Sequence, residues 1–344
     1  MAARHCGIVR LRLAVGLAGL MLAVALPVAA EQAKAPGEPG VKSSRPDSTG
    51  AKKRIYFGEP ARKGAYPFMV SIIHSDAKPT EDGLHAAHFC GGSLVRQRWV
   101  LTAAHCMYDL GQTPPRAREP GDINVYVGSN EFKGGQRIKV NRIVIHPAYN
   151  VEQDPDSDIA LVELAEAPAR GRTSIITLAT PATEKQYGVP GMPVKAAGWG
   201  ETEEGDFPRT LLEVSLDIVD AGTCNSNIVS WRRNQWFEMQ VTGLRSKLAL
   251  SDEVVEGMRK LLDASPHAPV ITENMVCTAK FATRRDTCVG DSGGPLFAEV
   301  ARGQFIQIGL TSFSESGCGM AEQGLFGIYT RVARFVDWIE QTTR

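Results

Sequence analysis

The feature that most constrains the fold is a succession of short apolar runs, separated by turn residues, from Ile55 to the end of the chain. The clearest runs are FMVSII (68–73), INVYVG (123–128), RIVIHP (142–147), DIALVEL (158–164), FIQIGLTSF (305–313) and GIYTRV (327–332). Runs of this length with Gly, Pro and Asn between them favour a sandwich or barrel over alternating β and α units. The glycine content, 34 of 344 residues, agrees with a turn-rich, all-β protein.

The charge balance excludes one class of function. The chain has 38 Lys and Arg residues and 38 Asp and Glu residues, so its formal net charge is zero. Nucleic-acid-binding proteins normally carry an excess of basic residues, so we expect no nucleic-acid partner. Hydrophobic residues make up 43% of the chain and charged residues 22%, which is typical of a globular protein with a substantial core.

Residues 1–30 have the pattern of a signal peptide. The basic start contains Arg4, Arg10 and Arg12. An apolar run over 13–26 follows, and Val28-Ala29-Ala30 supplies small residues at a cleavage site. A membrane anchor is the alternative, but the run is shorter than the roughly 20 residues that span a bilayer. We therefore expect an exported protein, secreted or periplasmic, with no membrane attachment after the signal peptide is removed.

Residues 31–54 are polar and rich in Pro and Gly. Such a segment cannot bury enough apolar surface to offset the entropy of ordering it, so we expect it to be disordered. It ends in the basic cluster Lys52-Lys53-Arg54. The segment is either a linker or a pro-segment, and removal of a pro-segment would create a new N-terminus at Ile55.

Cysteine usage agrees with export. The chain has seven Cys, and Cys6 would leave with the signal peptide. The remaining six form an even set, and disulfides persist in oxidising compartments. Six cysteines allow 15 pairings, and the sequence alone does not decide between them.

The segment 225–274 interrupts the β pattern, and we expect a helical insertion there. Ser251 is a candidate N-cap, acidic residues follow it, and Pro266 ends the run. One face of this helix carries Val255, Met258 and Leu262. At the end of the chain, 335–344 has apolar residues at helical spacing, which predicts a terminal helix docked on the core.

Three strings carry the residues of a nucleophilic catalyst. LTAAHC (101–106), DSDIALVEL (156–164) and DTCVGDSGGPL (286–296) contain His105, Asp158 and Ser292. A serine hydroxyl is a weak nucleophile at neutral pH and needs a neighbouring imidazole to accept its proton. The imidazole needs a buried carboxylate that fixes its tautomer and stabilises its charged form. Each string alone is ambiguous, but their occurrence together in this order is specific.

With further motifs, the chain resembles the trypsin/chymotrypsin family of serine endopeptidases from Ile55 to Arg344, apart from the insertion. These motifs are HFCGGSLV (88–95), AGWG (197–200), NMVCT (274–278) and WIEQT (338–342). The resemblance implies two six-stranded antiparallel β-barrels with the active site between them. Here a C-terminal helix and a helical insertion in the second half would be added.

The resemblance also implies roles for single residues. His105 would be the general base, Asp158 its orienting carboxylate and Ser292 the nucleophile of an acyl-enzyme mechanism. The backbone N–H groups of Gly290 and Ser292 would form the oxyanion hole. Ser312 resembles a substrate-pocket residue that also hydrogen-bonds the buried aspartate. The implied disulfides are Cys90–Cys106, Cys224–Cys277 and Cys288–Cys318.

Asp286 matches the family's position at the floor of the specificity pocket. A carboxylate there should select Arg or Lys before the cleaved bond, because its charge would otherwise stay unpaired. The plain alternative is an acidic turn residue. Gly327 keeps the family's glycine on one pocket wall, whereas Phe313 and Ser314 on the other wall replace a usual tryptophan and glycine. We expect Ser314 to restrict Arg relative to Lys.

The resemblance further implies maturation by an activating protease that cuts between Arg54 and Ile55. The new amino group would pair with Asp291 and order the oxyanion loop. The pair should raise the pKa of the amine above about 7.7–8, so we expect reversible inactivation as the pH rises through the raised value. The string IYFG (55–58) departs from the family's usual IVGG, with Phe57 at a glycine position.

Two alternatives remain open. A catalytically silent homologue would act by binding alone, and the insertion is either an exosite for a macromolecular partner or a surface decoration. The string SNEFKGGQR (129–137) has one acidic residue where the family often binds calcium, and hard cations take six or more oxygen ligands. We therefore expect no metal and no cofactor, and a monomer whose partners are protein or peptide substrates.

Overall fold

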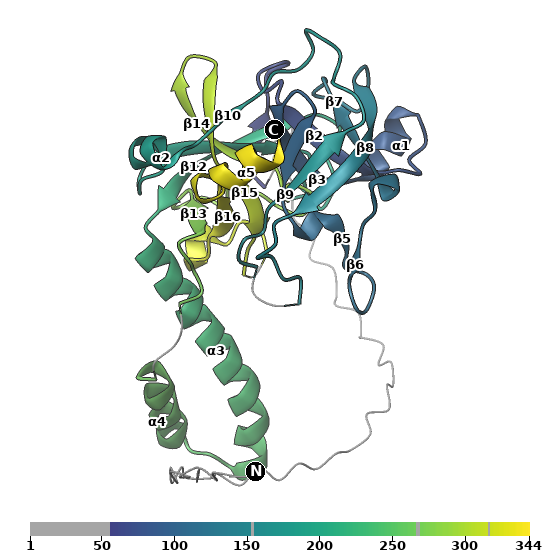
Figure 1. Ribbon diagram of the computed structural model, residues 1–344. Coiled ribbons are helices and arrows are strands. Elements are labelled where there is room, and N and C mark those ends of the chain that lie inside the picture. The colour runs from purple at the N-terminus through teal and green to yellow at the C-terminus, as the bar shows by residue number, and fades with distance from the viewer. Residues whose placement is uncertain (1–55, 153–154, 266–268, 316) are drawn as a thin grey trace, which may run out of the picture. The chain divides into compact units, whose positions relative to one another are not determined.

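A computed structural model describes residues 56–152, 155–265, 269–315 and 317–344 (Figure 1). The predicted signal peptide over 1–30, the predicted disordered pro-segment over 31–54, and Ile55 lie outside the described residues. In the ranges that are described, no helix combines the length and the apolarity needed to cross a bilayer.

The first half of the protein forms a closed, six-stranded antiparallel barrel (Figure 1). In barrel order its strands are β2 (Met69–His74), β3 (His88–Arg96), β4 (Trp99–Thr102), β9 (Ala160–Leu164), β8 (Gln136–Ile145) and β7 (Ile123–Val127). Branched side chains such as Val70, Ile72 and Leu101 fill the interior and are fully excluded from solvent. The apolar runs in this half therefore form strands, as predicted.

The second half forms another six-stranded antiparallel barrel. In order its strands are β12 (Leu212–Val219), β11 (Pro193–Gly198), β14 (Pro295–Ala301), β15 (Gln304–Phe313), β16 (Gly327–Arg331) and β13 (Met275–Ala279), and a β12–β13 pairing closes the ring. Two short strands attach to it: β1 (Glu59–Pro60) pairs with β12, and β10 (Thr177–Leu178) pairs with β15. The prediction of two six-stranded barrels is confirmed.

Shorter elements connect the strands. They are α1 (Glu81–Ala86), β5 (Tyr108–Asp109), β6 (Arg116–Ala117) and α2 (Pro181–Tyr187). The predicted terminal helix is α5 (Val336–Thr342), in which Ile339 is fully buried. The ring of His146 contacts those of Phe335 and Trp338 edge-on, at 5.0 and 4.9 Å, so the helix is docked as predicted.

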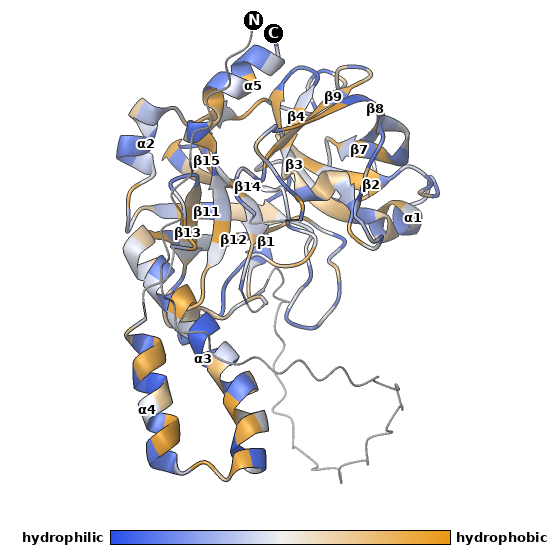
Figure 2. Cartoon of the chain, turned by 60° about the horizontal axis from the view of Figure 1, so that its bottom comes forward, coloured by the Kyte–Doolittle hydropathy of each residue, from blue (hydrophilic) through white to orange (hydrophobic). Residues whose placement is uncertain are grey.

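The expected helical insertion contains two helices, α3 (Ala221–Leu248) and α4 (Asp252–Asp263), which contact each other along the hairpin seen in Figures 1 and 2. The helical segment begins at Ala221 rather than at 225, because the Asp220 side chain caps the helix there. Ser251 caps α4, as predicted, by accepting a hydrogen bond from the N–H of residue 254. Pro266 lies outside the described residues.

The helix α4 places Val255, Met258 and Leu262 on one face, as predicted, but this face is only partly buried. Val255 and Leu262 are half-buried, but Met258 is exposed, and the half-buried residue between them is Arg259. The Arg259 guanidinium lies 4.4 Å from the ring centre of Phe237 in α3. A guanidinium can cover an aromatic ring while its stem packs on apolar surface, so Arg259 contributes to the contact between α4 and α3.

Candidate active site

Two residues of the motifs, His105 and Asp158, are joined by hydrogen bonds. His105 begins a single 3₁₀ turn after β4, and Asp158 precedes β9. Oδ2 of Asp158 accepts from Nδ1 of His105 at 2.8 Å, and Oδ1 accepts from the His105 backbone N–H at 2.9 Å. The Ser312 hydroxyl donates to Oδ2 at 2.5 Å. The carboxylate, 1% exposed, therefore holds the imidazole in the tautomer with its proton on Nδ1.

This pairing shifts both pKa values toward the charged forms. Burial alone would lower the pKa of His105, but the charge of Asp158 and the hydrogen bond to it outweigh burial, and the pKa of His105 is raised. Burial alone would raise the pKa of Asp158, but the charge and hydrogen bonds of His105 and the Ser312 hydroxyl lower it. The carboxylate stays ionised, and the imidazole is a ready proton acceptor.

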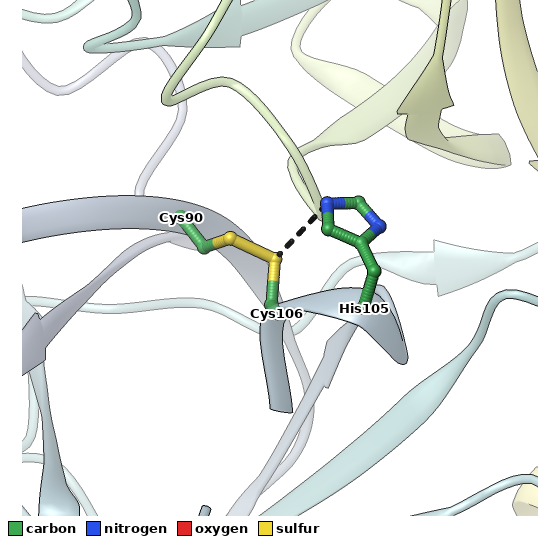
Figure 3. Close-up of side chains that lie close together, drawn as sticks. All are labelled: Cys90, His105 and Cys106. Atoms are coloured by element: carbon green, nitrogen blue, oxygen red, sulfur yellow. Dashed lines mark hydrogen bonds between the residues drawn. A yellow bond between two sulfur atoms is a disulfide. The ribbon is translucent and has the colours of Figure 1, made fainter. Parts of the chain in front are cut away.

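Ser292 lies in a tight turn that packs against the first barrel. The Gly91 N–H of β3 donates to the Ser292 carbonyl oxygen at 2.8 Å, and Sγ of Cys106 lies 3.6 Å from the same oxygen. Nε2 of His105 lies 3.7 Å from that sulfur (Figure 3). One sulfur atom therefore adjoins both the Ser292 backbone and the His105 ring. In the described parts of the chain, no hydrogen bond joins Nε2 to the Ser292 hydroxyl.

The sulfur beside the imidazole belongs to a disulfide. The bridges are Cys90–Cys106, Cys224–Cys277 and Cys288–Cys318, the pairs that the resemblance implies. Cys90, His105 and Cys106 place nitrogen and sulfur atoms within 4.8 Å of one another (Figure 3). Because the two sulfurs are bonded to each other, neither is a thiolate that could ligate a metal.

The turn before Ser292 presents backbone donors. Gly290 has φ of +94°, which residues with a side chain rarely adopt. Its carbonyl oxygen accepts from Nε2 of His88 at 3.0 Å. Among the residues that the structure describes, none accepts a hydrogen bond from the backbone N–H of Gly290 or Ser292. These two N–H groups can therefore bind an oxygen atom of a ligand.

His88 is a site residue that the sequence reasoning missed. A carbonyl oxygen only accepts, so the His88 proton is on Nε2, and Nδ1 accepts from the Ser71 hydroxyl at 2.8 Å. Burial lowers the pKa of His88 to about 4, although the Gly290 carbonyl opposes this shift. The ring is thus a neutral bridge between β2 and the Ser292 turn. The HFCGGSLV motif begins with His88, but nothing in it indicates a partner 202 residues away.

Asp291 is buried with backbone donors as its partners. Oδ1 accepts from the Gly200 N–H at 2.8 Å, and Oδ2 accepts from the Cys288 N–H at 2.9 Å. Burial raises the pKa of Asp291 to about 6, although both N–H groups oppose the shift. No side-chain cation in the described ranges forms an ion pair with it. Arg54 and Ile55, which would supply the expected amino group, lie outside those ranges.

A cavity of about 240 Å³ lies beside Ser292. It is lined by 287–289, Ser292, 311–314, 317–318 and Gly327. Asp286 adjoins it through Gly327, where a Cβ would come within 2.8 Å of Oδ1 of the carboxylate. Asp286 accepts hydrogen bonds from the N–H groups of Gly319, at 3.1 Å, and Thr287, at 2.8 Å. Glycine at 327 therefore leaves the carboxylate room beside the cavity.

Asp286 is a buried acid without a cation among the described residues. It is 4% exposed, and burial raises its pKa to about 7. The hydrogen bonds from Gly319 and Thr287 oppose this shift, and the charge of Asp291 adds to it. A carboxylate in this state takes up either a proton or a cation that enters the cavity.

The opposite wall of the cavity contains the two departures from the family pattern. The Ser314 hydroxyl donates to the Gly317 carbonyl at 3.1 Å, so it closes a turn within the wall. Phe313 is half-buried and packs against an apolar cluster that includes Ile228 and Phe326. The wall is thus supported partly by α3, the first helix of the insertion.

The chain directly after the expected cleavage site reaches the same region. The Tyr56 carbonyl accepts from the Asp286 N–H at 3.2 Å. Phe57 has φ of +57°, a left-handed conformation that favours glycine. Its N–H donates to Glu203 at 3.1 Å, and the Arg284 guanidinium lies 5.3 and 5.4 Å from the ring centres of Tyr56 and Phe57. These contacts offset the strain at Phe57.

Comparison with known proteins agrees with this geometry. The family model described as Trypsin matches residues 55–339. Mannan-binding lectin serine protease 1 of Mus musculus is 29% identical over 301 residues, which cover 84% of this chain and 35% of that protein. The Homo sapiens protein of the same name is 28% identical, with 84% and 36% covered. Transmembrane protease serine 9 of Rattus norvegicus is 29% identical, with 84% and 22% covered.

The chain therefore spans about a third or less of the length of these curated relatives. The family model, in contrast, covers most of the chain, including both barrels and the three motifs. The chain thus belongs to the trypsin family of serine proteases.

Proposed function

We propose that the protein is a serine endopeptidase that hydrolyses peptide bonds after Arg or Lys. Ser292 would be the nucleophile, His105 the general base and Asp158 the residue that orients and stabilises the imidazole. The observation that carries the proposal is the hydrogen-bonded pair of the buried Asp158 and His105 beside the Ser292 turn, next to a cavity that adjoins a buried acid.

The chemistry takes two steps. Nε2 of His105 accepts the hydroxyl proton as Oγ of Ser292 attacks the substrate carbonyl, then donates it to the leaving amine as the acyl-enzyme forms. A water molecule then attacks the ester carbonyl, its proton passes to His105, and Oγ regains a proton as the acid leaves. The catalytic Oγ–Nε2 hydrogen bond would form when substrate binds, since such bonds are often long in free enzymes.

The N–H groups of Gly290 and Ser292 would stabilise the oxyanion that develops on the carbonyl oxygen. Donors of this kind typically contribute about 2.7–4 kcal/mol each to transition-state stabilisation. His88 supports this role, because its bond to the Gly290 carbonyl holds the Gly290–Asp291 peptide unit within the turn.

Asp286 would bind the cationic side chain before the cleaved bond. A guanidinium or ammonium in the cavity supplies the cation that the described residues do not, whereas an apolar side chain leaves the carboxylate unpaired. Ser314 lines the same cavity, and we retain the expectation that it restricts Arg relative to Lys.

Activation would follow cleavage between Arg54 and Ile55, with the new amino group paired to Asp291. The pair would raise the pKa of the amine, so its stabilisation is complete below about 7.7–8 and is lost as the pH rises through the raised value. The Arg54→Ala precursor should stay uncut and inactive, and the cut protein should lose activity reversibly in alkali. A fully active uncut precursor would refute this scheme.

Export to the periplasm or the cell exterior, by a signal peptide over 1–30, completes the proposal. The partners would be protein or peptide substrates and an activating protease that recognises Lys52-Lys53-Arg54. N-terminal sequencing of the protein recovered outside the cytoplasm should yield Ile55 as the first residue. A mature chain that still contains residues 1–30 would contradict this part.

A panel of matched peptide amides with Arg, Lys, Leu or Phe before the scissile bond tests the specificity. We expect cleavage after Arg and Lys alone, and none by Ser292→Ala protein prepared in parallel. Preferred cleavage after Leu or Phe would contradict the role of Asp286, and activity that survives Ser292→Ala would contradict the role of the serine.

A further inference from the structure

The first turns of α3 are anchored to the second barrel. Cys224 is bonded to Cys277 of β13, and Ile228 is fully buried. Oδ1 of Asn225 accepts hydrogen bonds from the N–H groups of Val270 and Ile271, at 2.7 and 3.3 Å. This part of the insertion is therefore fixed relative to the barrel, and so is the backbone of the residues that follow it in α3.

Arg232, in the next turn of α3, forms a two-pronged ion pair with Glu315. Its Nε donates to Oε2 at 2.8 Å, and its Nη2 donates to Oε1 at 2.6 Å. The Glu315 side chain is 8% exposed and that of Arg232 is 45% exposed. The planar guanidinium matches a carboxylate in this geometry, which a lysine ammonium cannot reproduce.

Glu315 directly follows Ser314, which lines the cavity of the candidate specificity pocket. The strand β15 ends at Phe313, and the cavity-lining residues Ser314, Gly317 and Cys318 follow it outside any strand. Without strand pairing, the position of this segment depends on local anchors. Arg232 supplies one from the insertion, and Trp231 beside it packs on the same apolar cluster as Phe313.

We propose that Arg232 is a positioning and specificity-determining residue, through which the insertion holds Ser314 and Glu315 beside the candidate specificity pocket and neutralises Glu315 there. The proposal deepens the proposed protease function and rests on it. The insertion would then control which charged side chains a substrate can carry near its basic residue.

The proposal predicts the direction in which each substitution changes the preference for charged side chains in the substrate. Without Arg232, the Glu315 carboxylate lacks its two-pronged partner and attracts cations instead. The kcat/KM should then rise for peptides with an additional Lys before the basic residue and fall for peptides with Glu there. Removal of the Glu315 charge makes this region more positive, so kcat/KM should fall for the Lys-containing peptide and rise for the Glu-containing one. A residue that only stabilised the fold would affect both peptides alike.

The experiment uses Arg232→Ala, Glu315→Gln and the double variant, with Arg245→Ala as the matched control. Arg245 pairs with Asp252 in the same helical hairpin, and the pocket wall is not involved in that pair. The measured quantity is the ratio of kcat/KM for a Lys-containing over a Glu-containing peptide. We expect it to rise roughly twofold to fivefold in Arg232→Ala, the range of a partly exposed charge pair. It should fall in Glu315→Gln and return to the wild-type value in the double variant.

Two further measurements keep the outcomes separate. Arg232→Lys, which keeps the charge but not the two-pronged geometry, should leave the ratio unchanged and raise KM for long peptides. If Arg232→Ala does not fold, Glu315→Gln and Arg232→Lys carry the test. A wild-type protein inert to fluorophosphonate and to arginine esters means that the proposed function fails. An active wild type with an equal ratio in all variants overturns the role of Arg232.

Discussion

Asp158 and Asp286 are two buried carboxylates of one site, and their surroundings act in opposite directions. Asp158 has an imidazole, a hydroxyl and a backbone N–H as donors, and its pKa is lowered. Asp286 has two backbone N–H groups and a cavity beside it, and its pKa rises to about 7. Asp291 resembles Asp286, with two backbone donors and a pKa of about 6.

The described chain supplies a charged hydrogen-bond partner for Asp158, whereas Asp286 and Asp291 have backbone donors alone. The first barrel supplies His105 and Asp158, which are already hydrogen-bonded to each other. The second barrel holds two buried carboxylates, Asp286 and Asp291, that have no ion-pair partner among the described residues. In the proposed function, a substrate side chain would pair with Asp286 and the new amino group with Asp291. Catalytic competence and specificity are therefore separable properties of this site, and they can be changed one at a time.

Disruption of the Asp158–His105 pair should lower kcat more than any other change considered below. In Asp158→Asn the amide favours the wrong imidazole tautomer, and we expect kcat to fall about 10⁴-fold, as for the corresponding change in trypsin. Asp156→Asn is the matched control, because this carboxylate bonds Ser157 and Asn274 and not the imidazole. Equal losses in the two variants, measured as kcat on one ester substrate, would contradict the orienting role.

Removal of the Asp286 charge should change the substrate specificity and leave the reactivity of Ser292 nearly unchanged. In Asp286→Asn we expect kcat/KM for Arg and Lys peptides to fall by about 10³-fold or more, because a buried polar site loses its charged partner. The rate of fluorophosphonate labelling should stay within about fivefold of wild type. Asp217→Asn, in a half-buried pair with Lys280, serves as the control. Unaltered preference for Arg would show that Asp286 is only a turn residue.

The raised pKa of Asp286 predicts the pH dependence of cation binding. A cation binds the ionised carboxylate, so protonation below pH about 7 competes with it. The affinity of Ser292→Ala protein for benzamidine, measured by calorimetry, should weaken by up to about tenfold per pH unit below that value and release a proton on binding. The same titration in Ser292→Ala/Asp286→Asn should be flat. A flat profile with Asp286 present would refute the assignment.

The smallest effect should come from the support behind the oxyanion turn. In Ser71→Ala, Nδ1 of His88 loses its donor, which loosens the Nε2 bond to Gly290. A lost hydrogen bond of about 1 kcal/mol corresponds to roughly fivefold in kcat, with the Arg-over-Leu preference unchanged. Ser129→Ala, whose hydroxyl bonds the Lys133 carbonyl in a surface loop, is the control. A change in preference, rather than in rate, would place His88 in the pocket instead.

Strand-length apolar runs and turn residues are local properties, and they predicted a sandwich or a barrel. The two six-stranded barrels were predicted by the resemblance to the trypsin/chymotrypsin family. The sequence predicted the Asp158–His105 contact because the motifs that carry these residues occur together in a recognisable order. It did not predict the contacts of His88 with Gly290 or of Arg232 with Glu315, because none of the motifs covers these pairs. No local pattern encodes such pairs.

Two further differences have local physical reasons. The insertion begins at Ala221, because the Asp220 side chain caps α3 directly after β12 ends at Val219. On α4, the guanidinium of Arg259 lies against the ring of Phe237, and the neighbouring Met258 is exposed. A capping side chain accounts for the first difference and a cation–π contact for the second.

The most direct test of the central claim is fluorophosphonate labelling of protein trimmed to Ile55, followed by mass spectrometry of the labelled peptide. The account predicts one phosphonyl group per molecule, on Ser292, and its loss in both Ser292→Ala and His105→Ala. Absence of label from folded, trimmed protein, or label of equal amount in His105→Ala, would contradict activation of the serine by the imidazole.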